Sequence, residues 1–404
     1  MTPADQTLSY RGRQAVGNPM RADLELFQDA TENEYHATHN PTGAVPLCIA
    51  ENVLNWTEME ALLHRAAAEE IPAEVSRYAS VLGLEEFRRA AAQFVGEDIA
   101  RQELDPACLA VAAGATAIVE LTALLLGDPG DAAVFPAPCY PVYRQDIANK
   151  AGLTRYDLVT HQSVGHLTGT HPLTLADLDR AHAELGPRFR LLVLTQPDNP
   201  TGAVYTAEQL TAFADWCVSH RIHLVVNEIY ALSVLATNHP ELAADYPAGS
   251  PAFQSFLPLL SRRRSPYLHW WYSFSKDFGI SGLRIGLLYS HNEALLTGFA
   301  NYGAPQVASN LPQHLLGRIL SHRAERQAFT ARNQTRITES YLTVIRPLRR
   351  LGIPYAPARG SLFVWLDLSR FLTAPTPAAE TELWQLIYRQ TGVLLTAPGG
   401  FGQP

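Results

Sequence analysis

The sequence predicts an α/β fold in which a mostly parallel sheet is covered by helices on both faces. Helical and strand-like stretches alternate from about residue 85 to residue 290. The strand-like stretches are short, apolar throughout, and end in polar or turn residues, as buried parallel strands do. Helices between such strands are the usual connection in a parallel sheet, and ligands bind beyond the carboxyl ends of its strands.

The expected elements follow one another along the chain. Residues 84–100 (LEEFRRAAAQFVGEDIA) have helical spacing, and residues 107–131 begin as a strand that turns helical at 114–116. Four later strands are expected within residues 131–143, 190–202, 222–230 and 269–276. After residue 310 we expect long helices, a strand in SLFVWLDLS (361–369) and a helix in 380–392. This C-terminal part predicts a second, smaller α/β domain.

The composition excludes several classes of protein. With 47% hydrophobic and 17% charged residues among 404, the chain is expected to be globular rather than disordered. A net charge of -8 and a pI near 6.0 disfavour nucleic acid or a membrane as partner. No run of 18 apolar residues occurs. The four cysteines are scattered, which predicts no disulfide framework, no metal site and a reducing cytoplasm.

One lysine indicates a chemical function. Lys276 and Lys150 are the only lysines among 31 basic residues, so arginine supplies positive charge almost everywhere else. A lysine amine, unlike a guanidinium, can lose its proton and attack a carbonyl. Ser273 and Arg284, on either side of Lys276, offer the hydroxyl and the fixed cation that hold a phosphate. An amine beside a phosphate site predicts the cofactor pyridoxal 5′-phosphate (PLP), bound through Lys276.

Further parts of a PLP site stand at strand ends. The helix start at Gly114-Ala115-Thr116 offers N–H groups to a phosphate. Tyr140 follows a strand in a proline-bracketed turn, where its ring can stack on a pyridine. Asn199 and Tyr230 can hydrogen-bond to the phenolate oxygen O3′ of the cofactor. A second NPTG, at residues 40–43, precedes every expected sheet strand and predicts only a turn.

The order of these motifs resembles the fold-type-I PLP enzymes of the class I and II aminotransferase superfamily. The motifs are GAT (114–116), PAPCYP (136–141), NPTG (199–202), NEIY (227–230) and SFSKDFGISGLRIG (273–286). The resemblance runs from about residue 35 to residue 400 and is closest to 1-aminocyclopropane-1-carboxylate (ACC) synthases. HNPTGAVPLCIAENVL (39–54) and the stretches 114–146 and 273–290 carry that likeness.

The resemblance implies a domain organisation. Residues 51–305 would form a large PLP-binding domain with a seven-stranded type of sheet. Residues 1–50 would form an N-terminal arm and part of the small domain, and residues 306–404 the C-terminal small domain. A homodimer with each active site at the subunit interface is also implied. In the family, an arginine that clamps the substrate carboxylate follows a turn like Pro398-Gly399. None follows Arg389 here, so we expect the sequence to be truncated.

The resemblance implies residue roles as well. Lys276 would hold the cofactor and remove the substrate α-proton. The phosphate would lie against Ser273, Arg284 and the amides of Ala115 and Thr116. Tyr78 corresponds to the tyrosine that reaches the phosphate of the neighbouring subunit.

The remaining roles concern the cofactor ring and the substrate. Tyr140 would stack on the ring, and Asn199 and Tyr230 would bind O3′. Glu51 corresponds to a glutamate that distinguishes ACC synthases from ordinary aminotransferases, and it suits a cationic sulfonium substrate such as S-adenosylmethionine (SAM). A helix-capping role is the structural alternative for Glu51.

Asn227 departs from the family pattern, which has aspartate at this position. An aspartate would stay ionised beside the protonated ring nitrogen and make the cofactor a stronger electron sink. Asparagine keeps the size and a hydrogen bond but removes the charge. Glu228 should not replace it, because adjacent strand residues point to opposite faces. The sequence leaves open whether Asn227 is natural or introduced.

These observations predict a PLP enzyme of ACC-synthase type that acts on SAM or a similar amino acid. It would remove the α-proton and eliminate the γ-group, and either cyclisation or γ-replacement by another nucleophile would follow. The second outcome would suit the biosynthesis of a specialised metabolite. One alternative is a class I aminotransferase that passes an amino group to a 2-oxo acid. Another is a PLP-fold binding protein with weak catalysis.

Overall fold

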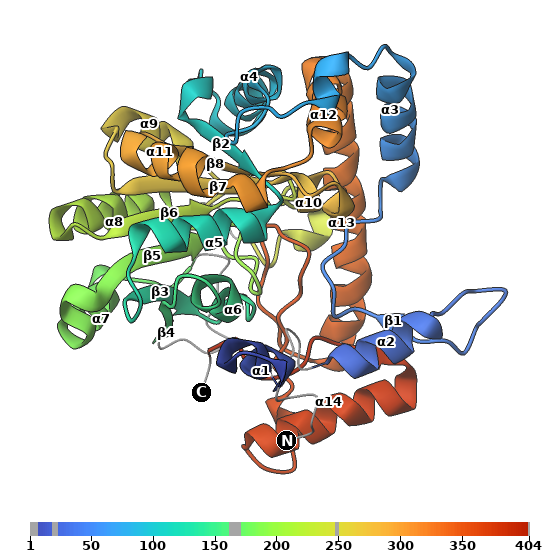
Figure 1. Cartoon of the computed structure of the whole chain (residues 1–404). Coiled ribbons are helices and arrows are strands. Elements are labelled where there is room, and N and C mark those ends of the chain that lie inside the picture. Colours follow the sequence, from blue (N-terminus) through green and yellow to red (C-terminus); the bar gives the residue numbers. More distant parts are fainter. Residues whose placement is uncertain (1–6, 18–22, 161–170, 247–249, 403–404) are drawn as a thin grey trace. The chain divides into compact units, whose positions relative to one another are not determined.

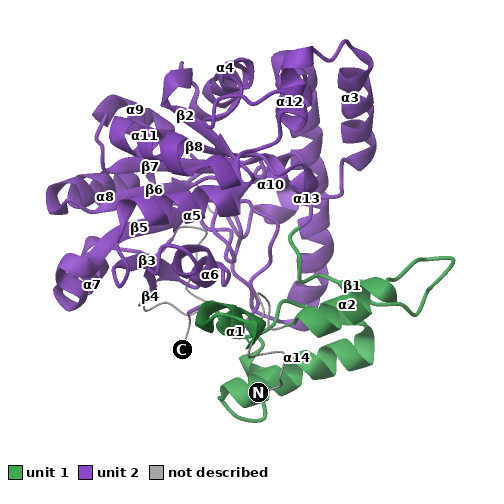
Figure 2. Cartoon of the chain, in the orientation of Figure 1, with its two compact units in different colours: residues 1–50, 368–401 green, residues 51–367, 402–404 purple. Residues whose placement is uncertain are grey.

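The computed structural model describes residues 7–17, 23–160, 171–246 and 250–402. Contacts divide the chain into a smaller unit, Met1–Ala50 with Leu368–Phe401, and a larger unit, Glu51–Asp367 with Gly402–Pro404 (Figure 2). Residues 306–367 group with the larger unit by this criterion. The domain boundaries expected from the sequence, at 50/51 and 305/306, stay a prediction.

A seven-stranded sheet forms the middle of the larger unit (Figure 1). Its strand order is β2-β8-β7-β6-β5-β3-β4, and every neighbouring pair is parallel except the two pairs that β8 makes. The predicted α/β fold with a mostly parallel sheet is therefore confirmed. β4 and β8 are strands beyond those expected from the sequence. The strands are β2 (Leu109–Ala112), β3 (Ala132–Ala137), β4 (Thr154–Val159), β5 (Phe189–Thr195), β6 (His223–Asn227), β7 (Leu268–Ser273) and β8 (Gly286–Ser290).

Helices cover both faces of this sheet because its strands are apolar on both sides. In β5, Leu192 and Leu194 join one buried cluster, and Leu191 and Val193 join the other. The first cluster packs under α4 (Glu85–Phe94), α7 (Leu175–Leu185), α8 (Ala207–His220), α9 (Leu257–Arg263) and α12 (Asn310–Ser321). The second packs under α5 (Ala115–Leu126), α6 (Tyr143–Ala148) and α11 (Glu293–Tyr302). This alternation is the period-two geometry of a strand.

The long helix α13 (Arg323–Leu351) and α3 (Trp56–Ala68) complete the larger unit, with the short α10 (Phe274–Asp277) after β7. The strand predicted for residues 361–369 is wrong. Only Leu366 forms an isolated bridge, with Tyr355. Pro354, next to Tyr355, accepts from the Asp367 N–H at 2.9 Å but has no backbone N–H to donate in return, so the ladder cannot continue in that direction.

The smaller unit is built from the two ends of the chain. β1 (Val45–Pro46) pairs in parallel with β9 (Val393–Leu394), beside α2 (Leu24–Glu32) and α14 (Pro377–Thr391). It also contains α1 (Tyr10–Gly17). The NPTG at residues 40–43 is a turn, as predicted, in which the Gly43 N–H donates to the Asn40 carbonyl at 3.1 Å. Among the described residues, no helix is long and apolar enough to span a membrane.

A largely buried ion cluster ties α13 to the residues that directly follow α4. The Arg326 side chain is completely buried, and its Nε donates to Asp98 Oδ2 at 2.7 Å. Its Nη2 donates to Glu97, whose side chain is partly exposed, and its Nη1 to the Leu320 carbonyl at 2.6 Å. Removing one partner of a buried pair leaves an uncompensated charge, which is more costly than losing an exposed pair.

We therefore expect Arg326→Met to lower the free energy of unfolding by about 3 kcal/mol or more, measured in urea. Arg323→Met is the matched control. It removes an arginine on the same helix that lies 3.5 Å from the same Glu97, but whose side chain is 61% exposed. The control should change stability by about 0.5 kcal/mol or less. Equal losses in the two variants would contradict the burial argument.

Candidate active site at the carboxyl ends of the strands

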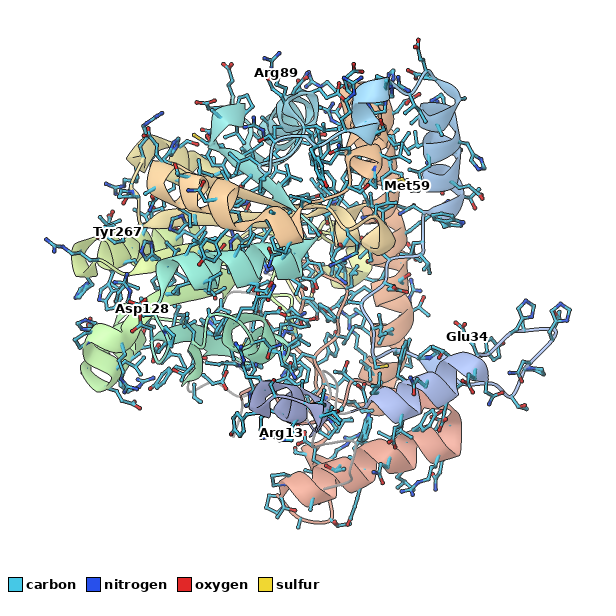
Figure 3. All side chains as sticks on the ribbon, in the orientation of Figure 1. Arg13, Glu34, Met59, Arg89, Asp128 and Tyr267 are labelled. Carbon is cyan, nitrogen blue, oxygen red and sulfur yellow. The ribbon has the colours of Figure 1, made fainter. Side chains whose placement is uncertain are left out.

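The residues singled out by their motifs lie at one edge of the sheet. Asn227 ends β6 and Ser273 ends β7. Gly114 lies two residues after the end of β2, and Asn199 and Tyr140 come shortly after β5 and β3. Asp128 and Tyr267, which precede β3 and β7, mark the opposite edge in Figure 3. The candidate site is therefore where an α/β sheet places its ligands.

The start of α5 forms an anion cradle with Arg284. Gly114 has φ +86°, and a Cβ at this position would lie 2.3 Å from Arg284 Nη2. Arg284 is itself held by its own hydrogen bonds, to the Ser281 carbonyl at 3.0 Å and to the Ala113 carbonyl at 3.4 Å. A guanidinium and the free N–H groups of a helix start thus lie side by side, a combination that suits a phosphate.

Two serine hydroxyls lie next to this cradle. Ser273 Oγ and Ser275 Oγ are 2.8 Å apart, and Ser273 also donates to the Ile285 carbonyl at 2.9 Å. The antiparallel β8 brings this pair to α5, because a Cβ on Gly286 would lie 3.0 Å from the Ala115 nitrogen. Thr116, in the first turn of α5, is exposed. The residues expected to bind phosphate are therefore together in the structure.

Lys276 lies on α10, directly after the serines. Burial lowers the pKa of its amine, and nearby Arg284 lowers it further, whereas the negative charge of Glu51 raises it. A lowered pKa makes the neutral, nucleophilic amine more available. Glu51 is exposed, so solvent screens its effect, but its carboxylate acts on the same amine.

The segment that carries Glu51 is fastened to Lys276 by buried amides. Asn52 Nδ2 donates to the Lys276 carbonyl at 3.1 Å and to Asn333 Oδ1 of α13 at 2.8 Å. Asn55 Nδ2 donates to the same Asn333 oxygen at 2.8 Å. Gly279 has φ +66°, and a Cβ there would lie 2.2 Å from the Asn52 carbonyl oxygen. The segment that carries Glu51 is therefore held against α10.

Asp277 connects α10 to the turn after Tyr230. Its carboxylate accepts from the Ser233 hydroxyl at 2.6 Å, from the Leu232 N–H at 3.0 Å and from the Tyr272 hydroxyl at 3.0 Å. Burial raises the pKa of Asp277 to about 7, although these donors oppose the shift. Nothing in the sequence motif distinguished Asp277, whose partners come from two segments, residues 232–233 and Tyr272 of β7.

Tyr230 and Asn199 face one another on the same side of the sheet. Asn199 Nδ2 lies 3.5 Å from Tyr230 Oη, and both side chains are buried. Burial raises the pKa of the Tyr230 hydroxyl, so it stays a neutral donor. Two polar groups at this distance can share one oxygen of a ligand.

Asn227 has partners that the sequence did not indicate. Its Nδ2 donates to Tyr143 Oη at 2.8 Å, and Tyr143 Oη lies 3.1 Å from Thr195 Oγ1. The Tyr140 ring packs edge-on against Tyr143, with ring centroids 5.4 Å apart. Tyr143 and Thr195 were missed because hydrogen bonds between β5, β6 and α6 have no sequence signature.

Glu228 points to the other face, as the strand geometry predicts. Its carboxylate accepts from Gln196, Ser255, the Phe256 N–H and Trp270 at 2.6–2.8 Å. Tyr78 is fully exposed, and none of the contacts described above includes it. Among the described residues, no cluster of three or more His, Cys, Asp or Glu could hold a metal ion.

Comparisons with known proteins agree with this geometry. The family described as aminotransferase class I and II matches residues 39–404. The 1-aminocyclopropane-1-carboxylate synthase 2 of Oryza sativa subsp. japonica is 31% identical over 376 residues, 91% of this chain and 75% of that protein. The 1-aminocyclopropane-1-carboxylate synthase 7 of Arabidopsis thaliana is 29% identical over 91% of this chain and 82% of that protein.

Solved structures share the fold. A double mutant of Thermus thermophilus aspartate aminotransferase aligns with a TM-score of 0.75 over 98% of this chain and 92% of that one, at 22% identity. An aminotransferase from Mycobacterium tuberculosis aligns with a TM-score of 0.72 over 98% and 95%, also at 22% identity. The resemblance to fold-type-I enzymes is therefore confirmed at the level of fold.

The amide cluster around Asn333 yields a prediction. Asn333→Ala removes the oxygen that accepts from both Asn52 and Asn55, and should lower the free energy of unfolding by about 1–3 kcal/mol. Thr335→Ala, an exposed site on the same helix, is the control and should be nearly neutral. Urea unfolding measures the free energy of unfolding of both variants. Similar small losses in the two would contradict a stabilising role of the amide cluster.

Proposed function

Because the chain belongs to the aminotransferase class I and II family and is a PLP-dependent enzyme, we propose that it is of ACC-synthase type. Its substrate would be SAM or a similar amino acid with a γ-leaving group. The reaction would remove the α-proton and eliminate the γ-group, and cyclisation or γ-replacement would follow. The likeness to two plant ACC synthases at about 30% identity supports this reaction class.

The site residues fit the cofactor in the following arrangement. The start of α5 with Ser273 and Arg284 would bind the phosphate, and Lys276 Nζ would hold the cofactor covalently. Asn199 and Tyr230 would hydrogen-bond to O3′, and Tyr140 would cover one face of the ring. When bound, the cofactor withdraws electrons from the substrate α-carbon and so acidifies its proton.

The chain's own part in the reaction centres on Lys276. Once substrate has displaced it, its amine would take the α-proton at Nζ. The lowered pKa of this amine favours the neutral form that can accept a proton. The Asn52 amide, bonded to the Lys276 carbonyl, would keep α10 and the Glu51 segment in one arrangement during that transfer.

The observation that carries the choice of substrate is the charge of Glu51 acting on the Lys276 amine. A carboxylate whose charge reaches the reacting amine would attract a sulfonium, which is permanently cationic, and orient its departing sulfur. Substrates of ordinary aminotransferases carry no such charge. The Glu51 segment is not a helix cap in the described structure, since α3 begins at Trp56 with Asn55 at its N-cap position.

We also propose a homodimer, in which Tyr78 reaches the phosphate bound by the partner. Tyr78 is fully exposed, and further large apolar side chains of the larger unit are exposed too: Val53, Trp56, Ile71, Tyr302 and Val307. Exposed apolar surface of this kind is typical of protein interfaces. The proposed compartment is the cytoplasm, because none of the four cysteines, all of them described, forms a disulfide.

The cofactor assignment predicts a difference between the two lysines. Lys276→Ala should abolish the visible absorbance of the lysine-bound cofactor and its fixation by borohydride. Lys150→Ala is the matched control and should change neither, because the Lys150 side chain is half exposed and pairs with Glu120 of α5 at 2.8 Å. A borohydride-fixed adduct in the Lys276 variant would reject Lys276 as the attachment site.

The substrate proposal is tested by products formed from SAM with and without a 2-oxo acid. Release of methylthioadenosine supports the ACC-synthase type, whereas pyridoxamine phosphate formation supports the aminotransferase alternative. If neither product forms, the result supports the alternative of a weakly catalytic binding protein.

Glu51→Gln should weaken SAM binding or γ-bond cleavage by about tenfold, on the order of 1.4 kcal/mol. Binding of small neutral amino acids, followed by absorbance, should be nearly unchanged. Added salt should reduce the effect, because Glu51 is exposed and its charge is screened. Equal losses of binding or activity with both substrate types would indicate that Glu51 has only a structural role.

A further inference from the structure

The orientation of the Asn227 side-chain amide is determined by its neighbours. The backbone N–H of Ile229 lies 3.2 Å from Asn227 Oδ1, and an N–H can only donate, so the oxygen must be on that side. The nitrogen is then on the other side, where it donates one hydrogen to Tyr143 Oη at 2.8 Å. One further N–H of the same amide is left to donate elsewhere.

Tyr143 and Thr195 hold this arrangement in place. The Tyr143 ring is buried and stacks on Phe135, with centroids 4.7 Å apart and planes 26° apart. Its hydroxyl accepts from Asn227 and shares a second hydrogen bond with Thr195 Oγ1 at 3.1 Å. Burial raises the pKa of the Tyr143 hydroxyl, so it stays neutral. The three side chains form an uncharged chain.

No carboxylate hydrogen-bonds to Asn227, Tyr143 or Thr195 in the described part of the chain. Glu228 is on the opposite face with four donors of its own. The Asp198 carboxylate accepts instead from the Thr201 hydroxyl at 2.5 Å. Asp146 lies one turn along α6 from Tyr143, and burial raises its pKa to about 7. The polar group at the end of β6 is therefore a donor without a charge.

We propose that Asn227, positioned by Tyr143 and Thr195, donates a hydrogen bond to the ring nitrogen of the cofactor, which is therefore bound unprotonated. This rests on the proposed function, which places the cofactor ring between the phosphate cradle and the O3′ partners. A pyridine nitrogen without a proton accepts a hydrogen bond. A protonated one is a donor and would face the amide N–H, donor against donor.

The consequence concerns the type of reaction. A ring without positive charge withdraws electrons less strongly, so negative charge at the substrate α-carbon is less stabilised. A substrate whose γ-leaving group departs quickly is then favoured over one whose reaction needs a proton to be returned. A sulfonium departs as a neutral thioether and meets this requirement. The uncharged chain thus favours loss of the γ-group over transamination.

The test is the ¹⁵N NMR signal of ring-labelled cofactor bound to the full-length protein. The wild-type signal should lie in the range of an unprotonated pyridine, and Asn227→Asp should move it to the protonated range. The aspartate variant should fold, because the Ile229 N–H and the Tyr143 hydroxyl can both donate to a carboxylate. A protonated signal in the wild-type protein, or no change in the aspartate variant, would overturn the proposal.

Two further variants test the positioning residues. Tyr143→Phe removes one hydrogen bond of the amide, and should raise the cofactor dissociation constant about fivefold while the nitrogen stays unprotonated. Thr195→Val should act in the same direction, whereas Thr297→Val, at an exposed threonine of α11, should do nothing. Unchanged cofactor affinity in both Tyr143 and Thr195 variants would remove them from the proposal.

The outcomes separate this inference from the proposed function. Cofactor bound through Lys276 with a protonated ring nitrogen would overturn the inference alone. Wild-type protein that shows no signal of bound labelled cofactor would overturn both.

Discussion

The close approach of Arg284 to Gly114 is the constraint on which the candidate site depends. A guanidinium can lie against the start of α5 only because Gly114 has no Cβ and adopts φ +86°. The approach also depends on the direction of β8, which runs antiparallel between β2 and β7. Because of that direction, β8 begins beside the end of β2, and Arg284, two residues before β8, lies near the start of α5. The antiparallel strand in an otherwise parallel sheet therefore has a direct effect on the anion cradle.

Because side chains alternate along β6, Asn227 and Glu228 point to opposite faces of the sheet. Asn227 faces the side of α5 and α6, where the candidate site lies, whereas Glu228 faces the opposite cluster and satisfies four donors there. A one-residue shift in this strand would place the carboxylate in the site and the amide in the core. The buried sheet, with its interdigitated apolar side chains on both faces, prevents such a shift.

Hydrogen bonds from neighbouring segments hold α10, and with it Lys276, in place. α10 is only four residues long and could not hold its own orientation by helix propensity alone. Asn52 fastens its carbonyl side, and Asp277 fastens it to the turn after Tyr230. Hydrogen bonds therefore connect α10, which carries Lys276, both to the Glu51 segment and to the turn after Tyr230. These hydrogen bonds bring segments distant in sequence together at the candidate site.

The sequence by itself determined the fold class and indicated the residues of the candidate site, because both rest on local patterns. Apolar runs ending in turn residues marked the strands, and Lys276, Asn199, Tyr230 and Gly114 were identifiable from their motifs. A strand was expected at residues 361–369, where the apolar pattern was present, but the neighbouring segment contains Pro354, which has no N–H to donate to a ladder.

Only the tertiary structure decided which groups support the site. Tyr143 and Thr195 contact Asn227, and Asn333 contacts Asn52, across separations of many residues. Hydrogen bonds of this kind depend on how layers are stacked, and no spacing in one chain encodes them. The direction in which the Asn227 amide points was likewise decided by a backbone N–H two residues away in a turn, since an asparagine in a sequence has no orientation until its neighbours are in place.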